Sequence, residues 1–79
     1  MKVTAFLEAV RTEVDRAQAK HAPMNSAHEA YAVILEELDE FKAEVWKQTR
    51  NRDTAHMAME LIQIAAMCAR AASDLELGS

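Results

Sequence analysis

The segment Leu35-Glu36-Glu37-Leu38-Asp39-Glu40-Phe41-Lys42-Ala43-Glu44 decides the fold, because its acids are interleaved with apolar residues at helical spacing. With Ile34 at the centre of the buried face and about 100° of rotation per residue, four apolar residues lie within about 40° of that centre: Ala30, Leu38, Phe41 and Val45. Glu37 and Glu44 then lie at the edge of this face, and Glu40 lies just beyond it. The segment predicts an amphipathic helix with acids beside its buried side.

The spacing of these acids permits two interpretations. Carboxylates three residues apart on a helix have Cβ atoms about 5–6 Å apart, close enough to hold one hard cation directly or through its waters. Glutamate is also a strong helix former, and acidic clusters on helices are commonly solvated faces. Repulsion does not decide between them, because like charges four residues apart cost only about 0.2–0.5 kcal/mol in an exposed helix.

The composition predicts one all-α domain over residues 1–79. Hydrophobic residues make up 51% of the chain, yet it has one Trp, one Tyr, two Phe, one Gly and one Pro, which favours helices over turns. A chain of this size buries only about 60% of its unfolded surface, so we expect help from a partner chain. The net charge of −4, without a basic cluster, argues against binding to a nucleic acid polymer.

The single cysteine and the hydropathy pattern bear on location. Cys68 lies in a run of Ala, Met and Ile, where we expect a small buried residue in a reducing compartment. No charged-then-apolar signal opens the chain, and the uncharged stretch from Leu61 to Ala69 is too short to span a bilayer. We therefore expect a cytoplasmic protein without membrane association.

Three amphipathic helices are predicted, over residues 2–20, 26–47 and 53–74. Pro23 breaks the first pattern, since it lacks the N–H that a helix needs. Ser26 with Glu29 three residues later forms a capping-box pattern that begins the second helix, with Asn25 as a competing cap. Asp53 caps the third helix. The polar residues 48–52 join the second and third helices into an antiparallel hairpin.

The third helix is apolar on nearly all sides. Its main face is centred on Leu61, and the members of that face are Met57, Leu61, Ile64, Ala65, Cys68 and Ala72. Met59 and Ile62 cover much of the opposite side, and a helix that is apolar all round is buried all round. Three helices cannot easily enclose it. We expect an antiparallel helical bundle, three helices per chain, completed by oligomerisation.

A second polar strip follows one flank of the third helix, about 100° to 160° from Leu61. Its members are His56, Glu60, Gln63 and Met67. In an antiparallel hairpin Glu60 can approach Glu37 and Glu40, so that the three share a groove. Carboxylates crowded in a partly buried groove raise each other's pKa unless a cation neutralises them, which favours a divalent ion.

Two motifs lie within NSAHEAYAVILEELDEF (residues 25–41) and MELIQIAAM (residues 59–67). These segments resemble the MazG-like branch of the all-α nucleoside triphosphate pyrophosphohydrolases. That superfamily has a Glu-Glu-x-x-Glu motif on one helix and a Glu-x-x-Asp motif on the next. Glu36, Glu37 and Glu40 match the first motif. Glu60 matches the Glu of the second, and Gln63 stands where the family has Asp.

The resemblance implies a magnesium-dependent enzyme that cleaves nucleoside triphosphates to monophosphate and pyrophosphate. Glu37, Glu40, Glu60 and Gln63 would be the metal ligands, with Mn²⁺ as an alternative ion, and Glu36 a fourth acid or the catalytic base that orients water. Magnesium would neutralise charge on the phosphates and activate the water. The resemblance also implies a homodimer or homotetramer that binds nucleotide between neighbouring subunits.

Basic residues at three places are candidates for substrate binding. Lys47, Arg50 and Arg52 surround the predicted hairpin loop and can attract phosphate. His28 at the start of the second helix and His56 on the third can contact a base or a metal. The alternatives are solvated loop charges and structural histidines.

A second function, from a different class, also fits the sequence. The Gln63 amide keeps a carbonyl oxygen for Mg²⁺ but lacks the negative charge of Asp. The chain would then be a catalytically degenerate helical oligomer that acts as a nucleotide- or protein-binding module.

Overall fold

The computed structural model describes residues 1–78 as three α-helices and one 3₁₀ turn, without a strand in that range. The elements are α1 (Val3–Lys20), α2 (Ala27–Val45), η1 (Thr49–Asn51) and α3 (Thr54–Asp74). The all-α prediction is confirmed, and α2 ends two residues before its predicted end. No helix within residues 1–78 combines the length and the apolarity that crossing a bilayer requires.

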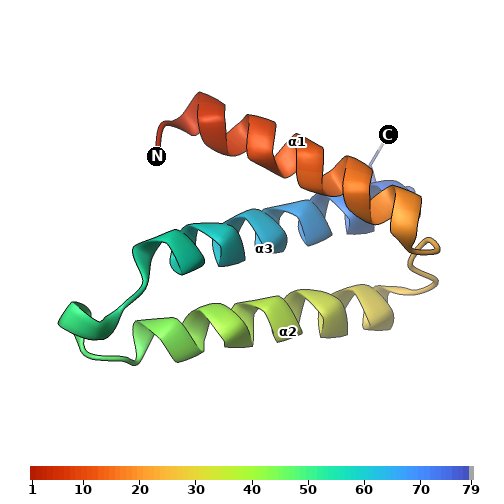
Figure 1. The fold of residues 1–79 in the computed structure, drawn as a ribbon. Helices are drawn as coiled ribbons and strands as arrows, with labels where there is room; N and C mark the ends of the chain where they lie inside the picture. The colour runs from red at the N-terminus through yellow and green to blue at the C-terminus, as the bar shows by residue number, and fades with distance from the viewer. Residues whose placement is uncertain (79) are drawn as a thin grey trace.

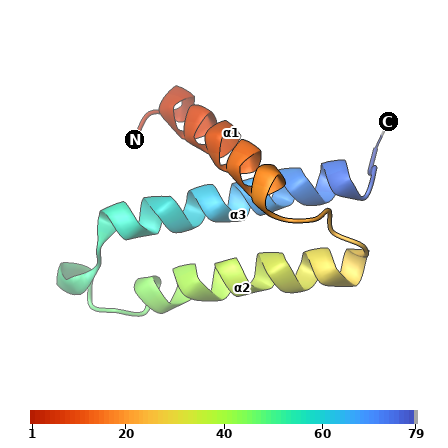
Figure 2. The ribbon, with the colours of Figure 1, turned by 45° about the vertical axis from the view of Figure 1, so that its right-hand side comes forward.

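Helix α3 is the central element, because it packs against both α1 and α2 (Figure 1). Helices α2 and α3 run in opposite directions and form the predicted antiparallel hairpin. Helix α1 crosses α3 obliquely on the side away from α2, as the turned view in Figure 2 shows. The structure is therefore a helical hairpin with a third helix laid across one of its arms.

Side-chain caps set where α2 and α3 begin. The Ser26 hydroxyl accepts a hydrogen bond from the Glu29 N–H at 3.1 Å, and the Asp53 carboxylate accepts one from the His56 N–H at 3.1 Å. The Glu29 carboxylate returns to the N–H of Asn25 at 3.2 Å rather than to that of Ser26. Both predicted caps are confirmed, since each satisfies an N–H that a helix start leaves free.

The connector between α1 and α2 is tied to the end of α3. The Met24 N–H donates to the Asp74 carboxylate at 2.9 Å, and the Arg70 guanidinium donates to the Ala22 carbonyl at 3.3 Å. These two hydrogen bonds fix the corner of the chain at which α1 meets the hairpin.

Small side chains make up most of the core. Ala66 is fully buried and Ala17 is 1% exposed. The buried hydrophobic residues are Ala17, Met24, Ala30, Ala66, Met67 and Ala71. Alanines let helices approach closely, but each buries little apolar area, so the hydrophobic contribution to stability is small.

Two buried faces differ from those predicted. Leu38 on α2 is 48% exposed, and Leu61 and Cys68 on α3 are exposed, so the prediction that the chain's own helices bury them is wrong. The buried flank of α3 instead includes Glu60 and Met67, which belong to the predicted polar strip. The reason is that α3 turns this flank toward α1 and α2. The apolar pattern of a single helix does not predict which face will meet the neighbouring helices.

Overpacking tests the alanine core. We expect Ala66→Leu to destabilise the protein by about 1–3 kcal/mol, because a larger side chain at a fully buried position forces the helices apart. Ala69→Leu, an exposed position on the same helix, is the matched control and should change little. Urea unfolding followed by circular dichroism measures both. Equal unfolding midpoints for the two variants would contradict the packing of α3.

Candidate metal centre

Three carboxylates from two helices meet near the middle of the hairpin. Glu37 and Glu40 come from α2 and Glu60 from α3, and each offers an oxygen that lies within 4.8 Å of the other two. Glu37 and Glu40 are three residues apart and share one side of α2, while antiparallel packing brings Glu60 across from α3. We call these three residues the acidic cluster. Their proximity was predicted from the sequence.

Glu60 is the buried member of the acidic cluster, with 6% of its surface exposed. One of its carboxylate oxygens, Oε1, lies 2.9 Å from Nε2 of His56. The other, Oε2, is buried and has no hydrogen-bond partner among residues 1–78. An unsatisfied buried polar group costs about 1–3 kcal/mol, and more when it is charged. The Oε2 side of Glu60 therefore lacks a positive charge or a proton donor.

The pKa values of the two α2 acids respond to this crowding. Burial raises the pKa of Glu37, and the charges of Glu40 and Glu60 add to the effect. The close approach of the Glu60 carboxyl raises the pKa of Glu40. A cation between the three groups would reverse both shifts, because an opposite charge favours the ionised form.

The donor set fits a hard divalent ion. Carboxylate oxygens are the ligands that Mg²⁺ and Mn²⁺ prefer, and Mg²⁺ keeps several waters beside one or two carboxylates. Oxygens bound to one Mg²⁺ at about 2.1 Å lie at most about 4.2 Å apart. The separation of up to 4.8 Å in the acidic cluster is close to that limit, so small side-chain rotations would bring the oxygens within it.

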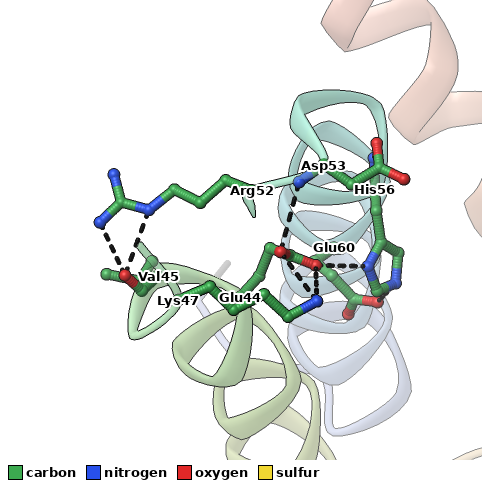
Figure 3. A network of polar contacts seen from close by, with 7 residues as sticks. All are labelled: Glu44, Val45, Lys47, Arg52, Asp53, His56 and Glu60. Carbon is green, nitrogen blue, oxygen red and sulfur yellow. Dashed lines mark hydrogen bonds and ion pairs between the residues drawn. The ribbon is translucent and has the colours of Figure 1, made fainter. Parts of the chain in front are cut away.

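Glu44, a buried acid at the end of α2, is linked through His56 to Glu60 of the acidic cluster (Figure 3). Glu44 is 3% exposed and accepts hydrogen bonds from the His56 ring Nδ1 at 3.2 Å and from the Asp53 N–H at 3.3 Å. The Lys47 ammonium lies 3.1 Å from its Oε2. The hydrogen bond to His56 lowers the pKa of Glu44, and the same bond raises the pKa of His56. We call Glu44, Lys47, Asp53 and His56 the loop network.

The basic residues predicted to bind substrate do not form one surface. Lys47 is paired with Glu44, and the Arg52 guanidinium donates to the Val45 carbonyl at 2.6 and 3.2 Å (Figure 3). Arg50 is exposed in η1, and His28 is exposed in the first turn of α2. Because the 19 residues of α2 span about 28 Å, His28 and the loop lie at opposite ends of the helix. Substrate binding by these four residues stays a prediction.

Two other predicted site residues are Gln63 and Glu36. Gln63 lines a cavity together with Glu37 and with Glu13 of α1, and the pKa of Glu13 is held low mainly by Arg16 and to a smaller extent by Gln63. Glu36 is exposed and lines a shallow groove on the outer side of α2 together with Leu35 and Glu40. The structure thus brings three of the predicted acids together in the acidic cluster, and Gln63 lines a cavity with one of them, Glu37.

A cavity of about 450 Å³ adjoins the cluster at Glu37. It lies among α1, the connector, α2 and α3, and its lining includes the cations Arg16 and Arg70 and the apolar residues Met24, Val33 and Met67. Arg70 is 6% exposed, and its Nε has no hydrogen-bond partner among residues 1–78. No pattern in the sequence predicts this cavity, because only the position of α1 across the hairpin creates it.

Comparison with protein-family models, curated proteins and solved structures finds no match for this chain. The resemblance to the MazG-like pyrophosphohydrolases therefore depends on the two acidic motifs and their flanking pattern. The geometry of the acidic cluster is an independent observation, since it comes from the packing of α2 against α3.

The crowding of Glu37 and Glu40 predicts a pH-dependent stability. An acid whose pKa is raised on folding, from the ordinary 4.5, contributes stability at low pH that is lost as the pH rises through the raised value. We expect the Glu37→Gln, Glu40→Gln double variant to melt at a higher temperature than the wild type at pH 8 and at a similar temperature at pH 4. Differential scanning calorimetry measures both.

Magnesium provides the second arm of this experiment. Millimolar Mg²⁺ at pH 8 should raise the melting temperature of the wild type and leave that of the double variant unchanged. Asp39→Asn, an exposed acid of α2 outside the acidic cluster, is the control and should behave as the wild type. If Mg²⁺ shifts the melting temperatures of all three proteins equally, the acidic cluster does not bind the ion and is a solvated face.

Proposed function

We propose that the protein is a MazG-like nucleotide pyrophosphohydrolase of the cytoplasm, which uses Mg²⁺ to hydrolyse (d)NTP to (d)NMP and pyrophosphate. One observation carries the proposal. The Glu60 carboxylate is buried with one unpartnered oxygen, and it lies within 4.8 Å of two further carboxylates beside a cavity of about 450 Å³. The resemblance in sequence supports the same class of reaction.

Residues of the chain would divide the work as follows. Glu37, Glu40 and Glu60 would hold the metal, and Gln63 is the proposed fourth ligand. The ion, Mg²⁺ or Mn²⁺, supplies positive charge for the phosphates and acidifies a bound water. Glu36 is the proposed base that orients water, and its charge already contributes to the raised pKa of Glu37.

The cavity suits the nucleoside part of such a substrate. Its apolar wall of Met24, Val33 and Met67 can contact the faces of a base, and the Arg16 and Arg70 guanidiniums can donate to polar edges or to phosphate. Glu37 belongs both to the cavity and to the acidic cluster, so a molecule in the cavity would reach the metal ligands directly.

One observation favours the alternative, a nucleotide- or protein-binding module without catalysis. The Gln63 side chain carries no charge, so the acidic cluster offers an ion three carboxylates. A smaller negative charge holds a divalent ion less strongly, so hydrolysis should be slow at best and metal binding by the free protein weak.

The oligomeric part of the proposal rests on exposed apolar side chains. Leu35 and Leu38 of α2 are 38% and 48% exposed, and Met59 and Leu61 of α3 are 61% and 42% exposed. Large exposed apolar side chains on neighbouring helices commonly mark an interface between proteins. We propose a homodimer or homotetramer in which a second copy covers them, which would also supplement the small alanine core.

Pyrophosphate release tests the catalytic function. We expect slow, metal-dependent release from at least one member of a panel of canonical and modified nucleotides with Mg²⁺ or Mn²⁺. Glu60→Gln should abolish it, because the substitution removes the charge of the buried ligand. Gln63→Asp should raise the rate by about 10-fold or more. Losing a residue that only hydrogen-bonds a metal ligand already costs about 10–100-fold, and Asp at this position would bind the metal itself.

Gln63→Asn is the matched control, since it changes the side chain as Asp does but adds no charge. It should not raise the rate. Nucleotide binding without pyrophosphate release from any protein in the set would favour the non-catalytic module. A Gln63→Asp variant that is folded and unchanged in metal affinity would show that Gln63 is not at the site.

Light scattering after gel filtration tests the oligomer. The wild type should elute as a dimer or tetramer at micromolar concentration, and Leu35→Lys with Leu38→Lys should lower its mass toward that of the monomer. Leu77→Lys, an exposed apolar residue beyond α3, is the control and should keep the wild-type mass. A stable wild-type monomer at this concentration would overturn the oligomeric proposal.

A further inference from the structure

We infer that His56, fixed by Glu44, is a positioning residue for Glu60 that holds one carboxylate oxygen and leaves the other for the metal. The inference rests on the proposed function, because it assigns the supporting partner of a ligand in the same site. It concerns two residues of the loop network to which the acidic motifs assign no role.

Contacts on both sides of the imidazole carry the inference. His56 Nε2 lies 2.9 Å from Glu60 Oε1, and His56 Nδ1 lies 3.2 Å from Glu44 Oε1 (Figure 3). His56 and Glu60 are four residues apart on α3, so the ring reaches the carboxylate along one side of the helix. The ring is held between acids that come from two different helices.

Glu44 is itself fixed, which makes it an effective anchor. It is 3% exposed, and its two oxygens receive the Asp53 N–H, the Lys47 ammonium and the His56 ring. Because Glu44 belongs to α2, it sets the position of the His56 ring relative to the helix that carries Glu37 and Glu40. The imidazole thus fixes Glu60 of α3 relative to the acids of α2.

The same contacts exclude His56 as a metal ligand. Both ring nitrogens point to carboxylate oxygens, so neither offers a free lone pair to an ion in the acidic cluster. What the ring does supply is orientation. With Oε1 held, Glu60 keeps one rotamer, and its unpartnered Oε2 is the oxygen left for the ion.

Calorimetric titration of the full chain with Mn²⁺ tests this assignment. Loss of a partner that orients a metal ligand typically weakens metal affinity by about 10–100-fold, so His56→Ala should raise the Kd by at least about 10-fold. His56→Gln keeps an N–H donor and should restore part of the affinity. Glu44→Gln removes the charge of the anchor but keeps an oxygen that can accept from the ring, so a smaller loss is expected. Circular dichroism establishes that each variant is folded.

A double-mutant cycle separates positioning from a general structural effect. If His56 acts through Glu60, adding His56→Ala to Glu60→Gln should weaken the remaining affinity by no more than about twofold. Thr54→Ala, an exposed position in the first turn of α3, is the control and should bind as the wild type. In ¹⁵N spectra, Mg²⁺ should shift the ring nitrogens of His56 and not those of the other two histidines.

Each outcome has a defined meaning. A wild type that binds no Mn²⁺ and releases no pyrophosphate overturns the proposed function and this inference together. A wild type that binds Mn²⁺ as tightly as a folded His56→Ala variant overturns the inference alone. Fully additive losses in the cycle also overturn it, because His56 would then act independently of Glu60. If His56→Ala does not fold, Glu44→Gln and His56→Gln decide by the same criteria.

Discussion

The packing of one flank of α3 against two other helices is the constraint on which the structure depends. That flank carries Ala66 and Met67, but it also carries Glu60 and Arg70, so enclosing it buries a carboxylate and a guanidinium together with the apolar core. Each charged group keeps one polar atom without a partner among the described residues. Burying this flank therefore both stabilises the fold, through apolar contacts, and destabilises it, through unsatisfied polar atoms. Of those atoms, Glu60 Oε2 belongs to the acidic cluster and Arg70 Nε belongs to a residue that lines the cavity.

The fold and the acidic cluster could be predicted because their signals are local. Ser26 and Asp53 mark the starts of α2 and α3, because each caps its helix through a hydrogen bond to the residue three positions later. The three-residue spacing of Glu37 and Glu40 places both on one side of a helix, whatever surrounds that helix. Glu60 required one further step, the antiparallel turn. A polar loop between two helical patterns is enough to supply that step.

The remaining features could not be predicted, because they depend on which side of each helix meets its neighbour. Leu38 and Cys68 look like core residues by periodicity, yet both are exposed because the helices turn other faces inward. Glu44 was placed at the edge of the buried face and given no role, although it is among the least exposed charged residues of the described chain. The cavity that Gln63 and Glu37 line together with Glu13 requires the position of α1, which no local pattern predicts.

The two ends of the hairpin differ in the entropy that their closure costs. Glu44 closes a loop of nine residues when it accepts from the Asp53 N–H, whereas Asp74 closes one of fifty when it accepts from the Met24 N–H. Closure entropy grows with the logarithm of loop length, so the longer closure costs about 1.5 kcal/mol more. The short closure lies inside the long one, so pairing α2 with α3 from their loop outward brings Met24 close to Asp74 and avoids most of that extra cost. The nesting of the two closures thus favours assembly of the hairpin from its loop toward the connector.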